Sequence, residues 1–231
     1  MEISAKGLIF DYGGTIDTNG VHWGEVFRSV YERYSVPVTL DEFRNAYVQV
    51  ERALGNGQVI HPDHTFEETL HIKLKLQFEI LKINDLSLAG KIAEACYSET
   101  RQTTLRAAKI LDDLKKCYPI VLASNFYGNL RTVLDEFNLS KYFCHVIESA
   151  EVGIRKPNPA IYALGIKALE LHPEEVAIIG DSYKNDIHPA NLLGCPSIWL
   201  KGKGWDNEDD AIEHPCIIKD FAMLRNLYPR H

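Results

Sequence analysis

Three features that would mark other classes of protein are missing from this sequence. The five cysteines are odd in number, widely spaced and without a Cys-x-x-Cys pair, which argues against a disulfide framework or a zinc ribbon. No basic run stands out among 25 basic and 32 acidic residues, so we expect no nucleic-acid partner. No apolar stretch approaches the roughly 20 residues that span a bilayer, and no signal-peptide pattern opens the chain, so we expect a cytoplasmic protein without membrane contact.

The length of 231 residues suits one α/β domain with an inserted lobe, or two modest domains. Short apolar runs, typical of buried strands, alternate with helical patterns in most of the chain, which predicts a parallel sheet with helices on both faces. The expected strands are Gly7–Phe10, Ile120–Ala123, Val146–Ile147, Val176–Ile179, Ser197–Leu200 and a weaker Cys216–Ile218.

The stretch from about His22 to Gln102 has a different pattern. Apolar residues recur at helical spacing, as in Val26, Val30 and Tyr34, and the stretch predicts four helices and no strand. Because a lone first strand needs the later strands beside it, the fold class we expect is a doubly wound, Rossmann-like α/β core (1–18 and 103–231) with an inserted all-helical cap domain (19–102).

Polar residues occur where the predicted strands end, and the binding crevice of an open parallel sheet lies beyond the carboxyl ends of its strands. They are Asp11, Ser124 with Asn125, Lys156 in a loop, and the pair Asp181 and Asp186. Each alone has an ordinary explanation as a turn residue, helix cap or solvated loop residue. The stretch from Gly202 to Asp210, rich in Gly and acidic residues, is most simply a solvated loop.

The order of these residues along the chain resembles the haloacid dehalogenase superfamily over nearly the whole length. The matching motifs are Asp11-Tyr-Gly-Gly-Thr15, Ser124-Asn125, Arg-Lys156-Pro and Gly-Asp181-Ser-Tyr-Lys-Asn-Asp186. The helical insertion after the first motif is similar to the cap of many family members. The resemblance implies a hydrolase that acts on a small phosphorylated or otherwise anionic metabolite.

The roles of the residues follow from that resemblance. Asp11 would be the nucleophile, while Ser124, Asn125 and Lys156 would bind the transferring group and Lys156 would offset its charge. The implied magnesium ligands are Asp11, the backbone carbonyl of Gly13, Asp181 and Asp186. A cluster of carboxylates needs a cation to offset its repulsion, and Mg²⁺ favours oxygen ligands.

Gly13 departs from the family's phosphatase motif, which usually has a second Asp there as general acid and base. Such catalysis typically contributes about 10²–10⁴-fold, so a plain phosphatase reading is weakened. Our first interpretation is a phosphatase in which another group or a water supplies the proton, restricted to substrates with good leaving groups such as acyl phosphates. The alternatives are a phosphonoacetaldehyde hydrolase-like enzyme, which the Asp-aromatic-small-Gly-Thr shape resembles, a 2-haloacid dehalogenase-like enzyme, for which Tyr12 stands one place too early, and a catalytically impaired ligand- or partner-binding protein.

Overall fold

The computed structural model describes residues 5–56, 59–205, 209 and 211–227. Its sheet has six parallel strands in the order β3-β2-β1-β4-β5-β6. The strands are β1 (Gly7–Phe10), β2 (Ile120–Ser124), β3 (His145–Glu148), β4 (Val176–Gly180), β5 (Ser197–Leu200) and β6 (Ile217–Ile218). The predicted Rossmann-like parallel sheet is confirmed, and its strand order reverses between β1 and β4.

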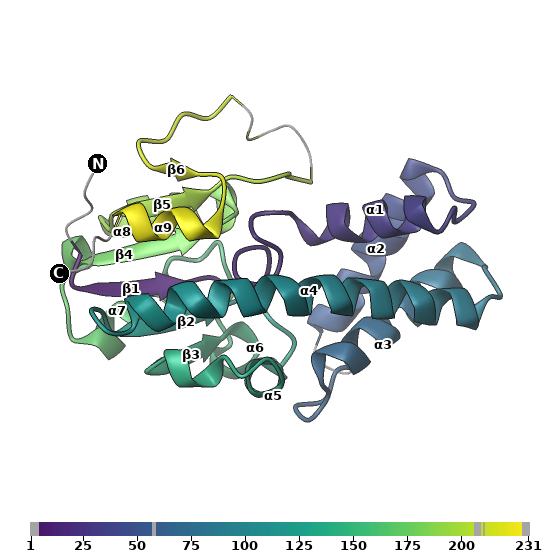
Figure 1. Ribbon diagram of the computed structural model, residues 1–231, viewed down its shortest axis with the longest axis horizontal. Coiled ribbons are helices and arrows are strands. Elements are labelled where there is room, and N and C mark those ends of the chain that lie inside the picture. Colours follow the sequence, from purple (N-terminus) through teal and green to yellow (C-terminus); the bar gives the residue numbers. More distant parts are fainter. Residues whose placement is uncertain (1–4, 57–58, 206–208, 210, 228–231) are drawn as a thin grey trace.

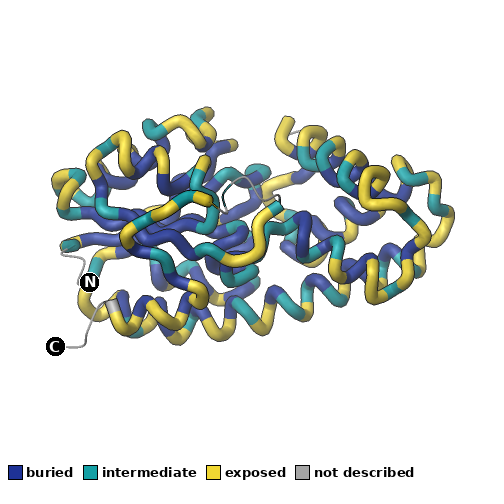
Figure 2. The backbone as a smooth tube through the Cα atoms, turned by 90° about the horizontal axis from the view of Figure 1, so that it is seen from above, coloured by how far each residue is buried: buried dark blue, intermediate teal, exposed yellow. Residues whose placement is uncertain are grey.

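Helices cover both faces of the sheet, because successive side chains of each strand point to opposite sides. Leu8 and Phe10 face a cluster that includes α5 (Leu130–Glu136) and α9 (Leu224–Leu227), whereas Ile9 faces α7 (Ala160–Leu169). The remaining elements beside the sheet are α6 (Ser149–Val152), α8 (His188–Leu193), η1 (Ser140–Tyr142), η2 (Pro173–Glu175), η3 (Tyr183–Ile187) and η4 (Phe221–Met223). Figure 2 shows the central strands as buried tube.

The insertion after β1 folds into helices, as predicted, and lies to one side of the sheet (Figure 1). These helices are α1 (Trp23–Arg33), α2 (Leu40–Gly55), α3 (Phe66–Leu81) and α4 (Leu86–Leu114). Thr39 and Thr65 begin α2 and α3 with capping boxes, in which each threonine and a glutamate three residues later satisfy free backbone N–H groups. Local sequence therefore fixes where the cap helices start.

Helix α4 runs for 29 residues, about 43 Å, and passes Gln102 without a break. Its first half packs against α1 and α3, and its last turns pack against the sheet and α9 (Figure 1). The passage from cap to core thus falls inside one helix, and the boundary at residue 102 stays a prediction. Among the described residues, we find no helix with the length and hydropathy needed to cross a membrane.

Candidate active site

The site lies at the carboxyl edge of the sheet, where three neighbouring strands end. Asp11 follows β1, Ser124 is the last residue of β2, and Asp181 follows β4. Since β1 lies between β2 and β4, these side chains converge on one crevice at the point where the strand order reverses. The backbone N–H of Asp11 still bonds to the carbonyl of Ile179, at 2.9 Å, which fixes the start of the loop.

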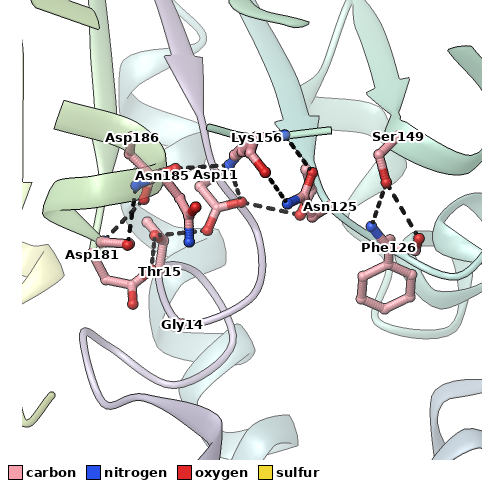
Figure 3. Close-up of polar contacts among 12 residues, drawn as sticks. Asp11, Gly14, Thr15, Asn125, Phe126, Ser149, Lys156, Asp181, Asn185 and Asp186 are labelled. Carbon is pink, nitrogen blue, oxygen red and sulfur yellow. Dashed lines mark hydrogen bonds and ion pairs between the residues drawn. The ribbon is translucent and has the colours of Figure 1, made fainter. Parts of the chain in front are cut away.

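Asp11 is buried and held by two donors from other elements (Figure 3). Its Oδ1 accepts hydrogen bonds from Lys156 Nζ at 2.6 Å and from Ser124 Oγ at 3.0 Å. The side chains of Asp11 and Lys156 are 8% and 2% exposed, so water screens this ion pair little. The structure therefore brings together the three residues predicted to be catalytic.

Thr15 joins two of the predicted acids and was not singled out from the sequence. Its Oγ1 lies 3.0 Å from Asp181 Oδ1 and 3.3 Å from Asp11 Oδ2. A hydroxyl has one hydrogen to donate, so it bonds one of these carboxylates at a time. The spacing of four residues from Asp11, across a tight Gly-Gly turn, was the signal available in the sequence.

Asp186 lies behind Lys156. Its Oδ1 accepts from Lys156 Nζ at 2.8 Å and from the Tyr162 hydroxyl at 2.6 Å, and its Oδ2 accepts from the backbone N–H of Ser182 at 2.9 Å. Lys156 thus forms ion pairs with both Asp11 and Asp186. Tyr162, in the middle of an apolar helix, gave no sign of this contact in the sequence.

Asn125 orients the backbone of the lysine loop. Its Oδ1 accepts from the backbone N–H of Lys156 at 2.9 Å, and its Nδ2 donates to the Lys156 carbonyl at 3.2 Å. This paired contact accounts for an amide directly after β2. Asn125 also lines the cavity above Asp11, and its binding of substrate stays a prediction.

The charges of the site perturb one another. Burial, reinforced by Asp186, raises the pKa of Asp11 although Lys156 opposes the shift. Burial and then the neighbouring carboxylates raise the pKa of Asp181 well above its usual range. Burial opposes the positive charge of Lys156, but Asp11 and Asp186 outweigh it and raise the lysine pKa. The three carboxylates of Asp11, Asp181 and Asp186 lie around the single ammonium of Lys156, so the ionised site carries an excess of negative charge.

This carboxylate cluster could hold a metal ion. One carboxylate oxygen from each of Asp11, Asp181 and Asp186 lies within 4.8 Å of the others. Glycines make room for the acids: a Cβ on Gly14 would lie 2.4 Å from Asp181 Oδ2, and one on Gly180 would lie 2.3 Å from the Asp186 carboxyl carbon. An all-oxygen donor set with excess negative charge fits Mg²⁺.

A cavity of about 350 Å³ opens above the acids. Its wall contains all the predicted site residues, together with residues of the loop after β5. These are Asp11, Gly13, Ser124, Asn125, Lys156, Asp181 and Asp186, with Lys201, Lys203 and Trp205 among the loop residues.

A second cavity of about 140 Å³ lies under the cap and shares Gly13, His22, Asn125 and Asp181 with the first. A Cβ built on Gly13 would meet no heavy atom within 4 Å. The missing side chain of the family motif therefore corresponds to open space in this structure.

The loop after β5 ties the core to the cap. Trp205 packs against His22 and Tyr47, with ring centroids 5.3 and 5.0 Å away, and Arg44 donates to its carbonyl at 3.1 Å. A Cβ on Gly24 would lie 1.9 Å from the Trp205 ring. The expectation of a solvated loop holds for the exposed residues 202–204 but is wrong for Trp205, because periodicity cannot show a contact between distant segments. Residues 206–208 and 210 lie outside the described residues.

The comparisons with known proteins agree with this geometry. The model of the haloacid dehalogenase-like hydrolases matches residues 5–194. A phosphoglycolate phosphatase from Salmonella typhimurium is 35% identical over 227 residues, 93% of this chain and 88% of the relative. A glyceraldehyde 3-phosphate phosphatase from Pyrococcus furiosus is 29% identical over 176 residues, 73% of this chain and 68% of the relative.

Among solved structures, a dehalogenase with an intermediate complex superposes with a TM-score of 0.66 at 17% identity. The match covers 100% of both chains, and at this identity it shows the fold alone. The resemblance predicted from the four motifs is confirmed. The chain belongs to the haloacid dehalogenase-like hydrolases.

Proposed function

We propose that this hydrolase is a magnesium-dependent phosphatase of a small phosphorylated metabolite, with Asp11 as its nucleophile. The observation that carries the proposal is the placement of Asp11: its Oδ1 is fixed by Ser124 and Lys156, and Asp181 lies beside it. A carboxylate with a role only in folding would have no need of an open cavity above it. Asp11 lines that cavity.

The chain's own residues account for the first step. An oxygen of Asp11 bonds to phosphorus as the bond from phosphorus to the leaving oxygen breaks, which gives an aspartyl phosphate that water then hydrolyses. Ser124 and Lys156 donate to Asp11 Oδ1, so they orient the carboxylate and are placed beside the incoming phosphoryl group. Asp186 and Tyr162 keep the Lys156 ammonium in position.

Magnesium fits the donors that remain. Asp181, Asp11 and the Gly13 carbonyl would hold it, and Asp186, whose two oxygens already accept three hydrogen bonds, would act mainly on Lys156. When bound, Mg²⁺ orients a phosphoryl group and offsets its charge. Its charge would also offset the repulsion from Asp186 and Asp11 that, after burial, raises the pKa of Asp181.

The relatives support a compact phosphate ester as substrate. The two relatives above are named as phosphatases of phosphoglycolate and of glyceraldehyde 3-phosphate. The leaving part of either compound is short, and the cavity of about 140 Å³ under the cap has room for a group of a few non-hydrogen atoms.

Cleavage of a carbon–phosphorus bond is the second candidate, and one observation favours it. Lys73 of α3 is buried and lines the same cavity as Gly13. A phosphonoacetaldehyde hydrolase-like enzyme would need a cap lysine to form a Schiff base with its substrate. However, Lys73 Nζ already contacts Glu51 at 2.8 Å and the Tyr127 hydroxyl at 2.7 Å, whereas Schiff-base formation needs the amine to reach the aldehyde carbon. We therefore rank the phosphatase first.

The remaining alternatives lack such support. Tyr12, which stands one place early for a 2-haloacid dehalogenase motif, is buried in the core against Phe126 and lines neither cavity. A binding protein without catalysis would be indifferent to a change of Asp11 to Asn.

Phosphate release tests the proposal. Purified protein is incubated with acetyl phosphate, p-nitrophenyl phosphate, phosphoglycolate, glyceraldehyde 3-phosphate, glycerol 3-phosphate and phosphonoacetaldehyde, with magnesium or with a chelator. We expect release that needs magnesium and that Asp11→Asn lowers by about 10⁴–10⁶-fold. Asp112→Asn, which changes an exposed aspartate on α4, is the matched control. Equal release by Asp11→Asn, or no release from any phosphate ester, would refute the proposal.

A further inference from the structure

One buried charged side chain of the cap has no role in the steps above. The cap has four lysines, Lys73, Lys75, Lys82 and Lys91; the last three are exposed, whereas the side chain of Lys73 is 7% exposed. A buried lysine is rare unless it is paired, so its partners are informative.

Lys73 meets partners from two other elements. Its Nζ lies 2.8 Å from Glu51 Oε1 on α2 and donates to the Tyr127 hydroxyl at 2.7 Å, and Tyr127 donates to Glu51 Oε2 at 2.5 Å. Tyr127 lies in the loop that follows β2, three residues beyond Ser124. The cap and the catalytic loop of the core therefore build this triad together.

The triad faces the space that Gly13 leaves open. Glu51, Lys73, Tyr127 and Gly13 line one cavity of about 140 Å³, and Asp181 is also in its wall. The rest of the wall is largely apolar or aromatic, with Trp23, Tyr47, Phe66, Leu70 and Phe126 among its residues. The ionisable side chains in this wall are His22, Tyr47, Glu51, Lys73, Tyr127 and Asp181, and Lys73 is the one lysine among them.

We propose that Lys73 is the general acid and base that the missing side chain at Gly13 would otherwise supply. The inference rests on the proposed phosphatase reaction and adds the source of its proton. An in-line attack by Asp11 expels the leaving oxygen on the side away from the nucleophile, and the open space at Gly13 is where the family's second Asp would act on that oxygen. Lys73 reaches the same cavity from the cap.

The proton balance of the two steps closes. In the first step the Asp11–phosphorus bond forms, the bond from phosphorus to the leaving oxygen breaks, and that oxygen takes a proton from the Lys73 ammonium. In the second step water attacks phosphorus, the neutral Lys73 amine takes a proton from this water, and the bond to Asp11 breaks. Phosphate, alcohol and the starting enzyme result.

Glu51 and Tyr127 are positioning residues for Lys73. Burial and the nearby Glu51 raise the pKa of the Tyr127 hydroxyl, so it stays protonated and donates a hydrogen bond to Glu51. Its oxygen is then free to accept from Lys73, which directs the ammonium. Tyr127→Phe would leave Glu51 paired with Lys73 but loosen the direction of the amine.

The test compares leaving groups that need a proton with leaving groups that do not. Lys73→Met, which keeps a side chain of similar length, is assayed on alkyl esters (phosphoglycolate, glyceraldehyde 3-phosphate and glycerol 3-phosphate) and on acetyl and p-nitrophenyl phosphate. We expect kcat on the alkyl esters to fall by about 10²–10⁴-fold, and on the activated substrates by less than about tenfold. Lys75→Met, an exposed lysine on the same helix, is the matched control and changes neither.

Two further variants separate proton transfer from folding or charge. Lys73→Arg keeps the charge but holds its protons too tightly to give them up, so activity on alkyl esters stays low. Gly13→Asp in the Lys73→Met background places a carboxyl in the open space. We expect it to raise kcat on the alkyl esters at least about tenfold above that of Lys73→Met alone. A merely structural role of Lys73 predicts rescue by Arg and none by Gly13→Asp.

The outcomes keep this inference apart from the proposed function. Equal losses on alkyl and activated substrates in Lys73→Met would overturn the role of Lys73, as would wild-type activity confined to activated substrates. Both results leave Asp11 as the nucleophile. Wild type that is silent on every phosphate ester overturns the phosphatase itself.

Discussion

The two sides of the site differ in how their charges balance. The phosphoryl half (Asp11, Ser124, Lys156, Asp181 and Asp186) has three carboxylates, two of them buried and Asp181 half-buried, against one ammonium. The cap half (Glu51, Lys73 and Tyr127) has one carboxylate, one ammonium and a hydroxyl that bonds both. The charges of the first half therefore leave an excess of negative charge, whereas those of the second balance.

Removal of the lysine from each half should sharpen this difference most. Lys156→Met leaves two buried carboxylates without their shared partner, and we expect the free energy of unfolding to fall by about 3–5 kcal/mol. Lys73→Met leaves Glu51, whose side chain is 27% exposed and can turn to water, so its cost should be about 1 kcal/mol. Urea denaturation in a chelator measures both. Equal losses of unfolding free energy in the two variants would contradict the difference between the two halves.

Asp17 connects the loop after β1 with the first helix of the cap. It should make the free energy of unfolding depend on pH by a few kcal/mol. It accepts from the Gly14 backbone N–H at 2.7 Å and from Trp23 Nε1, at the start of the cap, at 2.8 Å. Burial raises its pKa to about 7, against about 4 in an unfolded chain. Folding thus favours the protonated form, and this contribution to stability is full below about pH 4 and lost as the pH rises through 7.

The variant Asp17→Asn isolates that effect. Its stability relative to wild type should rise between pH 4 and pH 8, because only the wild type loses stability by ionisation of this carboxyl. Denaturation curves for both proteins at several pH values in that interval measure the difference. A constant difference, or one of the opposite sign, would contradict the assigned shift.

Magnesium affinity should distinguish two acids that the sequence could not separate. Asp181 Oδ2 has no hydrogen-bond donor among the described residues, whereas both oxygens of Asp186 accept such bonds. We expect Asp181→Asn to raise the half-saturating magnesium concentration by at least about tenfold, a change of about 1.4 kcal/mol. Tyr162→Phe should alter it less than threefold. Titration calorimetry with magnesium alone provides the values, and a larger effect of Tyr162→Phe would reverse the ranking.

The smallest expected effect concerns how the halves are held together. Gly24→Ala places a methyl group where the Trp205 ring lies, so the ring must move. We expect a loss of about 1 kcal/mol and a KM for phosphate esters a few times higher, with magnesium affinity unchanged. Gly55→Ala, whose Cβ meets no heavy atom within 4 Å, is the control. A change in magnesium affinity would show that the halves are not separable.

The phosphoryl half was predictable because a parallel sheet converts chain order into spatial order. Residues at the carboxyl ends of β1, β2 and β4 must meet at one edge, so the sequence alone could place Asp11, Ser124 and Asp181 together. Thr15 and Tyr162 could not, since their contacts depend on the path of a turn and on the angle of a helix.

The cap half depends on how two helices dock onto a core loop, which no local pattern specifies. Periodicity predicted the cap helices but treated its four lysines alike. One signal was present: Phe66, Thr69, Lys73 and Gln77 recur at helical spacing beside the apolar stripe of α3, and all are buried. A lysine on the edge of an apolar stripe is the kind of residue that tertiary packing turns inward.

The continuous helix α4 limits how this enzyme can open. The chain enters the cap through a short irregular segment, residues 18–22, but leaves it through a helix with no proline and no glycine between Lys91 and Leu114. Such a helix bends gently and does not fold at a point. The entry segment can then act as a hinge, while α4 moves as a nearly rigid rod. A small bend where α4 lies on the sheet therefore becomes a larger displacement at the far end of the cap.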